Sequence, residues 1–364
     1  MKRKPVKEIF LIRSIACLAI VLLHSIEASL KFYSPQGGLE NNTKVWYETF
    51  ALILKFGTPV FVLISIFLLA YSYPKKTPSG FIKKRIKFIL IPYLVMAVFY
   101  ALLDAYIQHL TVTLFLKQLF MNIFLGGYHG YFILIIFQFY LLYMLFQKYA
   151  HRFKAWYVII ICFIINFIYL GIFNFTKPID IPHAEYIWTR FSWVPFLGWL
   201  FYFSIAYYFG IHYEAFKKFL LKYNKYVIAF AILSCALVVF LYQSNLLIVH
   251  SSKRIDMLLF STAMFLLLYY VGAKLKSIPS FFSIISQYSF GIYLLHLFYI
   301  ALINKFIEHL PFLGLSMYIC ILLIGSTILS MISTHLLNMI PLGHYVVGKI
   351  GIKDKDKIKL QKAV

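Results

Sequence analysis

Residues 9–30 read IFLIRSIACLAIVLLHSIEASL, and within them only Arg13, His24 and Glu27 carry or readily gain a charge near neutral pH. A run of about 20 mostly apolar residues is long enough to cross the hydrocarbon core of a bilayer as a helix. Nine further stretches of this kind follow, near residues 47–73, 88–108, 131–147, 155–175, 191–212, 226–242, 255–273, 283–304 and 312–338. The sequence therefore predicts an all-α, polytopic transmembrane helical bundle of about ten helices.

The composition excludes a soluble globular protein. Of the 364 residues, 62% are hydrophobic and 13% are charged, whereas about half of a soluble domain is apolar. No polar gap is long enough to form a separate soluble domain. We expect a single transmembrane domain over residues 1–345 and a basic cytoplasmic tail over residues 346–364. The first span lacks a small-residue cleavage site and is expected to be retained.

The distribution of basic residues predicts the orientation. Of the 35 Lys and Arg residues, 25 fall in the two termini and the loops on their side, and 8 fall in the opposite loops. Basic residues concentrate in cytoplasmic loops, so both termini are expected in the cytoplasm. The basic residues that produce the net charge of +23 then lie beside helix ends, where anionic lipid headgroups are their expected partner. Nucleic acid is not expected.

The ionisable residues of the first span form a pattern. Arg13 and His24 are eleven residues apart, which returns to within about 20° of the same helical face and separates them by about 16 Å along the axis. Both can therefore face one cavity. Glu27 follows His24 by three residues, where it can hydrogen-bond the imidazole and select its tautomer. A purely structural role fits the same spacing, with Arg13 paired to a carboxylate and His24 to a backbone carbonyl.

Other ionisable residues within or beside the spans are weaker candidates. Asp104 can be the counter-ion of Arg13 or can point outward, and we favour the ion pair. Lys55 precedes a Gly-Thr-Pro sequence, and we expect its amino group to extend to the membrane surface. His296 lies in an apolar span, where a packed, hydrogen-bonded histidine is expected. His183, Glu185 and Arg190 share an outer loop and are expected to be solvated, although they could also touch a polar substrate.

Several chemistries find no support in the sequence. The four cysteines lie within predicted spans and have no metal-ligand spacing, so they are expected to be packing residues and no metal is expected. A zinc-protease helix motif, a Walker loop and a dinucleotide glycine fingerprint are all missing. Residues 109–130 are more amphipathic than their neighbours and predict a re-entrant or interfacial helix that leads to a glycine-rich turn at Gly126–Gly130.

Six ordered motifs resemble those of the acyltransferase-3 family of membrane acyltransferases. They are the Arg-x10-His first span, FGTPVFVLIS (56–65), KKRIKFILIPY (83–93), YHGYF (128–132), GWLFY (198–202) and YSFGIYLLH (288–296). The resemblance runs from residue 8 to about 340. It is closest to the branch that contains the intercellular-adhesin polysaccharide membrane protein of Gram-positive bacteria, which has been regarded both as an exporter and as an O-succinyltransferase.

The resemblance implies a multi-pass protein of a bacterial cell membrane that moves an acetyl or succinyl group from acyl-CoA to a hydroxyl of a cell-envelope polysaccharide or glycolipid. Such a reaction needs a general base that titrates near pH 7 and a cation for the oxyanion or the donor. His24 and Arg13 match these roles, and Glu27 would orient His24. Arg85 and Lys84 would bind CoA phosphates, although their cluster also fits a topological signal. The acceptor side would be lined by Tyr128, His129 and Asp104.

Two other functions stay open. The branch also suggests an exporter of a surface polysaccharide, although the chain has neither an ATPase motif nor an inverted repeat. A scaffold that assembles a polysaccharide synthase complex is a third hypothesis, but it gives Arg13 and His24 no role; such a complex could also be a partner of the transferase. The chain departs from the wider family at Ile64–Phe67, where Ser-Gly-Phe is commoner, and it has no secreted hydrolase-like domain, so peptidoglycan is a less favoured acceptor.

Overall fold

A computed structural model describes residues 5–33, 40–307 and 314–351, and the regular elements in these ranges are all helical. Their bounds are α1 (Glu8–Tyr33), α2 (Asn41–Leu54), α3 (Gly57–Ser72), α4 (Phe81–Arg85), α5 (Ile91–Ile107), α6 (Val112–Leu125), α7 (Tyr131–Tyr149), α8 (Ala155–Phe175), α9 (Ala184–Trp193), α10 (Leu200–Ile211), α11 (Tyr213–Lys222), α12 (Asn224–Gln243), α13 (Met257–Lys274), α14 (Ser280–Ile307), α15 (Leu315–Met339) and α16 (His344–Val347). A π-helical turn, Ile86–Leu90, joins α4 to α5. The predicted all-α class is confirmed.

The number of spans also agrees with the prediction. Within the described ranges, nine helical segments are long and apolar enough to cross a membrane, and α2–α3 and α4–α5 each count as one. A tenth span forms if α9 and α10 are counted together, although the chain bends by 47° between them. Pro195 lies at this bend, where a proline interrupts helical hydrogen bonding. The predicted stretch at 191–212 is therefore two helices that meet at an angle.

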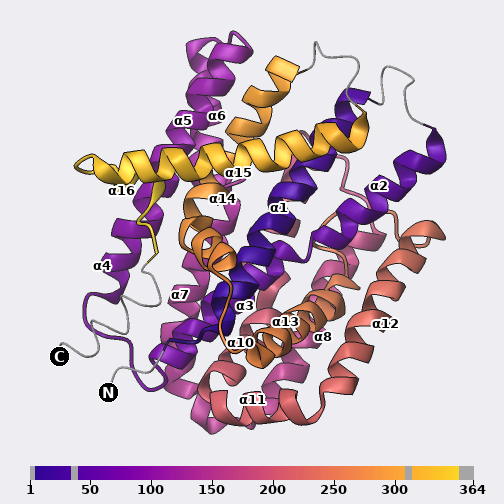
Figure 1. Ribbon diagram of the computed structural model, residues 1–364, viewed down its shortest axis with the longest axis vertical. Helices are drawn as coiled ribbons and strands as arrows, with labels where there is room; N and C mark the ends of the chain where they lie inside the picture. The colour runs from indigo at the N-terminus through magenta and orange to yellow at the C-terminus, as the bar shows by residue number, and fades with distance from the viewer. Residues whose placement is uncertain (1–4, 34–39, 308–313, 352–364) are drawn as a thin grey trace.

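Helix α1 is the centre of the bundle, and it crosses the middle of the molecule in Figure 1. It packs against α14, α15, α3, α13 and α2. Residues on all sides of α1 are buried, Ile12 and Ala16 completely. This environment explains why the stretch is apolar all round and not amphipathic. Any polar side chain that α1 carries must therefore face another part of the protein or a cavity.

The start of α1 meets α11 and the end of α13. Lys217 of α11 forms a 3.2 Å ion pair with the buried Glu8, and Lys7 donates a hydrogen bond to the Leu275 carbonyl. We call this end of the bundle the start side and the opposite end the far side. The distribution of basic residues predicts that the start side is cytoplasmic.

The second span is broken where it touches α1. Helix α2 ends at Leu54 and α3 begins at Gly57. A Cβ atom on Gly57 would lie 2.9 Å from the Ala16 carbonyl oxygen and 2.8 Å from Ile20. Only glycine lets the start of α3 approach α1 this closely. The break leaves Lys55 between the two helices, beside the C-terminal half of α1.

The helix predicted within residues 109–130 is present as α6. It runs back along α5: Gln118 is bonded to Asp104, the Asn122 side chain donates to the Ala97 carbonyl at 3.2 Å, and Tyr93 donates to the Ile123 carbonyl at 2.9 Å. Helix α6 ends at Gly126, whose φ of 62° lies in the left-handed region that glycine tolerates. The α5–α6 pair projects at the top of Figure 1.

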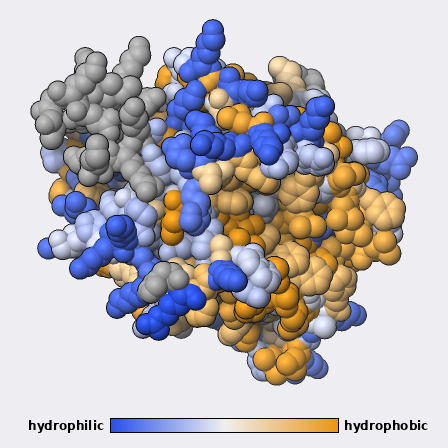
Figure 2. All heavy atoms as spheres, turned by 90° about the horizontal axis from the view of Figure 1, so that it is seen from below, coloured by the Kyte–Doolittle hydropathy of each residue, from blue (hydrophilic) through white to orange (hydrophobic). Residues whose placement is uncertain are grey.

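The surface is divided between apolar and polar areas. Seen from below, hydrophilic side chains gather over one part of this face and a broad apolar area covers another (Figure 2). Helix α8 alone exposes Ile160, Ile161, Ile164, Ile165, Phe167, Ile168 and Ile172. Such a surface suits contact with lipid.

The C-terminal part packs beyond the predicted domain boundary. Helix α16 contacts α5, α14 and α15, Val347 is buried, and the Gly351 amide donates to the Gln287 carbonyl. Residues up to 351 therefore contact the helical bundle, the division of the chain at residue 345 stays a prediction, and the rest of the predicted tail lies outside the described residues.

Candidate active site

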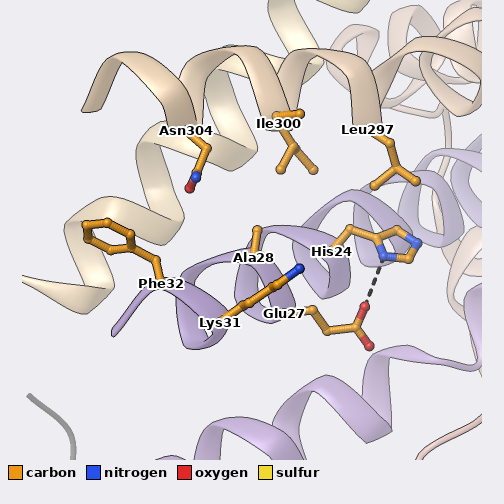
Figure 3. A pocket seen from close by; sticks show the side chains of 9 residues that line it. His24, Glu27, Ala28, Lys31, Phe32, Leu297, Ile300 and Asn304 are labelled. Carbon is orange, nitrogen blue, oxygen red and sulfur yellow. Dashed lines mark hydrogen bonds and ion pairs between the residues drawn. The ribbon is translucent and has the colours of Figure 1, made fainter. Parts of the chain in front are cut away.

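The predicted contact between His24 and Glu27 is present. Nδ1 of His24 donates to Oε2 of Glu27 at 3.0 Å. Successive turns of α1 bring the two residues together, because positions three apart lie on one helical face. The bond fixes the tautomer that carries hydrogen on Nδ1 and leaves the Nε2 lone pair free. In Figure 3 the second ring nitrogen of His24 points away from the Glu27 carboxylate.

Lys55 completes this group, and the expectation that it reaches the membrane surface is wrong. Its Nζ lies 2.8 Å from Oε1 of Glu27, and the Lys55 side chain is 10% exposed. The Glu27 carboxylate therefore accepts one bond from each partner. An ion pair compensates the high cost of placing a carboxylate at membrane depth. The sequence contained one indication of this inward position, because Lys55 directly precedes the Phe-Gly-Thr-Pro sequence at which the helix breaks.

His250 approaches the same carboxylate from the loop between α12 and α13. Its Nδ1 is 3.8 Å from Oε1 of Glu27, and its Nε2 donates to the Glu48 carbonyl at 2.9 Å. Burial lowers the pKa of His250, and the nearby Lys55 ammonium lowers that pKa further, so His250 adds no charge near pH 7. The buried pair of Arg254 and Asp256 holds this loop, with its shorter contact at 2.6 Å.

A pocket of about 540 Å³ opens beside His24, between α1 and α14. Its lining comprises His24, Glu27, Ala28, Lys31, Phe32, Leu297, Ile300, Ala301 and Asn304. In Figure 3, Leu297, Ile300 and Asn304 of α14 point toward the side chains of α1. The pocket has apolar walls with polar groups at both ends, an arrangement typical of sites that orient an amphipathic ligand. It lies toward the far side, which is predicted to face outward.

Two more histidines lie behind His24. The ring centres of His24 and His296 are 5.4 Å apart, and those of His296 and His129 are also 5.4 Å apart. His296 is 1% exposed. Its Nδ1 donates to the Ile292 carbonyl of its own helix at 2.9 Å. The expectation of a packed, hydrogen-bonded His296 is thus met at one nitrogen, but the sequence did not predict its contact with His24.

Tyr128 and His129 do not line the pocket beside His24. The Tyr128 hydroxyl donates to the Tyr93 carbonyl at 2.7 Å, and the buried Tyr128 ring stacks on Tyr93 and Tyr100. Nε2 of His129 donates to the Tyr293 carbonyl at 3.0 Å. Their polar atoms are committed within the protein, and their contact with a substrate stays a prediction.

Arg13 and Arg85 both lie in the neighbourhood of Tyr140, toward the start side. The Arg85 guanidinium lies 5.0 Å from the Tyr140 ring centre and 4.9 Å from that of Phe81. Arg13 and Arg85 both interact electrostatically with Tyr140. Lys84 is exposed one residue before Arg85. These cations come from α1 and α4, and no ion pair to Arg13, Lys84 or Arg85 occurs among the described residues.

The predicted ion pair between Arg13 and Asp104 is wrong. Asp104 accepts a hydrogen bond from Gln118 of α6 at 3.3 Å. Arg13 lies in the second turn of α1, near the start side, whereas Asp104 lies in the last turn of α5. Both helices run from the start side to the far side, so the two residues sit at opposite levels of the bundle.

The remaining candidates stay apart from His24. Arg190 donates to the Gly126 carbonyl at 2.5 Å and lies over Tyr186 and Trp193, while His183 and Glu185 are exposed. Among the described residues, no group of three or more His, Cys, Asp or Glu side chains is placed to hold a metal ion.

Comparison with known proteins decides the family. Residues 6–335 match the acyltransferase domain that defines the acyltransferase-3 family. The chain belongs to this family. It is 38% identical to the "Putative membrane-bound acyltransferase YfiQ" of Bacillus subtilis (strain 168), with 98% of each chain covered. No solved structure matches it.

Two further relatives carry a different description. A "Probable poly-beta-1,6-N-acetyl-D-glucosamine export protein" of Staphylococcus aureus (strain MRSA252) is 30% identical over 79% of this chain and 81% of the relative. A protein of the same description from Staphylococcus epidermidis is 29% identical over 81% of each. The resemblance inferred from the motifs is confirmed, and the protein is a multi-pass, membrane-bound transferase of the acyltransferase-3 family in bacteria.

Proposed function

We propose that this acyltransferase moves an acetyl or succinyl group from acyl-CoA to a hydroxyl of a cell-envelope polysaccharide or glycolipid, with His24 as the general base. One observation carries the proposal: the only histidine of α1 is bonded through Nδ1 to Glu27 and lies at the wall of a pocket. The bond leaves Nε2 free to accept a proton. This is the arrangement that a general base requires.

The proposed reaction is direct acyl transfer. Nε2 of His24 takes the proton of the acceptor hydroxyl, and the hydroxyl oxygen forms a bond to the thioester carbonyl carbon. The carbon–sulfur bond then breaks, and the CoA thiolate takes the proton from His24. Glu27 stabilises the imidazolium that forms between these steps, and Lys55 keeps Glu27 ionised. The acceptor enters through the pocket between α1 and α14.

The donor is proposed to bind from the start side. Arg13, Arg85 and Lys84 bring three cations to that region, and arginine suits phosphate because its donors form a planar fork. The pantetheine arm would then reach along α1 toward His24, a distance of about 16 Å by helix geometry. Tyr128 and His129 would shape the wall behind the reacting groups, and Asp104 would contact the acceptor near the far side.

Purified protein tests the assignment of His24. Wild type and His24→Ala are reconstituted in lipid and given labelled acetyl-CoA or succinyl-CoA with an oligomer of β-1,6-linked N-acetylglucosamine as the probe acceptor. We expect His24→Ala to lose about 100-fold or more of the transfer rate, because general base catalysis contributes about 10²–10⁴-fold. His335→Ala, in an exposed residue of α15, is the matched control. Full activity in a folded His24→Ala protein would exclude the mechanism.

Polysaccharide export is the second candidate, because several relatives are described as export proteins. The two functions leave different products in a strain without the gene. Loss of an exporter retains unaltered polymer in the cell, whereas loss of a transferase releases polymer that lacks acyl esters.

A further inference from the structure

The pocket beside His24 extends well beyond the reacting group. Among its lining residues on α1, Lys31 lies seven residues after His24. On α14, Asn304 lies seven residues after Leu297. Seven residues make two helical turns, or about 10 Å along the axis, and return nearly to the same face. The pocket is therefore a groove, and we call its His24 end the inner end and its Asn304 end the outer end.

Contacts at the two ends show that α1 and α14 run in the same direction along this groove. At the inner end, the ring centres of His24 and His296 are 5.4 Å apart. At the outer end, the Phe32 ring stacks on Tyr318 of α15 with centres 5.2 Å apart, and the Tyr318 hydroxyl is bonded to Asn304. An acceptor hydroxyl at His24 therefore fills only the inner end and leaves the outer end for another part of the ligand.

The amide of Asn304 is held in one orientation. Tyr318 is completely buried, and its hydroxyl donates to Oδ1 of Asn304 at 2.7 Å. The Nδ2 group of Asn304 carries two hydrogens, and neither has a hydrogen-bond acceptor among the described residues. In Figure 3 the amide points from α14 toward α1, into the pocket that it lines. Asn304 thus presents a fixed donor at the outer end of the groove.

The rest of the groove suits a sugar better than a lipid chain. Apolar side chains that can pack against the C–H face of a sugar ring line it between the two ends: Ala28, Leu297, Ile300 and Ala301. Lys31 forms no ion pair within the described part of the chain, and its amino group points back along α1 toward His24 in Figure 3. An amide N–H and an ammonium both need acceptor oxygens. Sugar hydroxyl and acylamino groups supply such oxygens, whereas a hydrocarbon chain does not.

We propose that Asn304, oriented by Tyr318, forms a second acceptor subsite that binds the sugar unit next to the one acylated at His24. The inference rests on the proposed function of His24 and narrows the acceptor to a saccharide of two or more units. A single sugar at His24 leaves the Asn304 amide without a partner, because two helical turns are longer than one sugar ring. The hydrogen bond at Asn304 therefore favours only the longer acceptor.

Binding to an inactive protein tests the subsite without acyl transfer. His24→Ala protein in lipid nanodiscs is titrated with N-acetylglucosamine and with its β-1,6-linked disaccharide, and ligand-observed NMR gives each Kd. We expect the disaccharide to bind about tenfold tighter, since one net hydrogen bond and the contact of a second ring are together worth about that factor. Adding Asn304→Leu should remove most of this preference. Asn42→Leu, in an exposed residue of α2, is the matched control and should leave the preference unchanged.

Two further variants separate the amide donor from a general disturbance of the groove. Asn304→Asp keeps an acceptor for the Tyr318 hydroxyl but has no N–H to donate, so it should lose the preference as Asn304→Leu does. Tyr318→Phe keeps the ring that stacks on Phe32 but no longer orients the amide, and we expect a partial loss. If Asn304→Leu does not accumulate, Asn304→Asp takes its place.

Three results would overturn the proposal. The first is a disaccharide that binds no tighter than the single sugar to the His24→Ala protein. The second is a preference that survives in folded Asn304→Leu and Asn304→Asp proteins. The third is a butyl glycoside of the same sugar that binds tighter than the disaccharide and equally well to Asn304→Leu, because the outer end would then hold a lipid chain.

Acyl transfer by the same variants with His24 restored distinguishes this inference from the proposed function. We expect kcat/KM to be about tenfold higher for the disaccharide than for the single sugar in the wild type, and nearly equal for the two in Asn304→Leu. A binding preference that depends on Asn304, in a protein that transfers no acyl group from acyl-CoA, rejects the proposed function but retains the subsite. Transfer that depends on His24, with equal kcat/KM for both sugars, rejects the inference alone.

Discussion

The carboxylate of Glu27 connects residues that are far apart in the sequence. One oxygen accepts from His24, three residues earlier, and the other is bonded to Lys55, in a different helix pair. The first contact follows from helix periodicity and was predicted. The second contact depends on the packing of the α2–α3 break beside α1. Hydrophobicity along the sequence does not predict such a packing contact. The sequence therefore predicted the contact between His24 and Glu27 but missed the contact of Glu27 with Lys55.

Glu27→Gln tests the orienting role. The amide keeps the size of the side chain but loses the charge that stabilises protonated His24, and its NH2 group permits the wrong tautomer. We expect the transfer rate to fall about tenfold or more, since a hydrogen bond to a charged group is worth about 1.5–3 kcal/mol. The rate is measured with labelled acyl-CoA. Glu214→Gln, in an exposed residue of α11, should match wild type. Equal rates in both variants would contradict the role of Glu27.

Lys55→Met tests the ion pair. Removing the ammonium leaves Glu27 without its cation at membrane depth, so the carboxylate is expected to bind a proton and to stop stabilising His24. We expect a loss of activity comparable to that of Glu27→Gln, and Lys55→Arg should restore most of it. The same assay measures both variants. If Lys55→Met transfers acyl groups as fast as wild type, the pair has no part in catalysis.

Among the helices, breaks and bends place the site. Hydropathy predicted the second span as one stretch over 47–73, because each side of the break is apolar. The break at Lys55 and Phe56 follows from the close approach of Gly57 to α1, which is a tertiary contact. The bent pair α9–α10 begins at Ala184, seven residues before the predicted span, because its N-terminal half lies in a more polar stretch that hydropathy does not mark. Sequence patterns therefore predicted the helices but not the break between α2 and α3 or the bend between α9 and α10.

Gly57→Ala tests the contact between α1 and α3. Alanine normally stabilises a helix relative to glycine by about 0.5–1 kcal/mol, but here its Cβ atom would meet the Ala16 carbonyl at 2.9 Å. We expect destabilisation, since overpacking costs about 1–3 kcal/mol. Thermal unfolding in detergent provides the comparison with Gly171→Ala on α8, where nothing lies within 4 Å of the added Cβ atom. A Gly57→Ala protein as stable as this control would show that the close approach is unimportant.

Across the whole molecule, the polar groups form two levels along the bundle. Arg13 and Arg85 lie toward the start side, whereas His24 with its pocket lies toward the far side, and the ring of His296 is 5.4 Å from that of His24. The charge pattern predicts that the start side faces the cytoplasm. A cytoplasmic donor and an external acceptor would then approach His24 from opposite directions, which gives the arrangement its proposed purpose.

Cysteine labelling tests this orientation. In a background without the four native cysteines, Asn42→Cys at the start of α2 and Lys218→Cys on α11 place single thiols at opposite ends of the bundle. Both positions are exposed. We expect a membrane-impermeant maleimide to label Asn42→Cys in intact cells and Lys218→Cys only after the membrane is opened. The reverse pattern would place the donor site on the wrong side of the membrane.

The central claim is that His24 transfers an acyl group to a cell-envelope glycan, and mass spectrometry of that glycan tests it most directly. Surface polysaccharide is compared from cells that lack the protein and from cells that express wild type, His24→Ala or His335→Ala at equal membrane levels. We predict ester-linked acyl groups with wild type and His335→Ala and none with His24→Ala, while polymer reaches the surface in every strain. Unchanged esters with His24→Ala, or polymer retained inside the cells, would contradict this account.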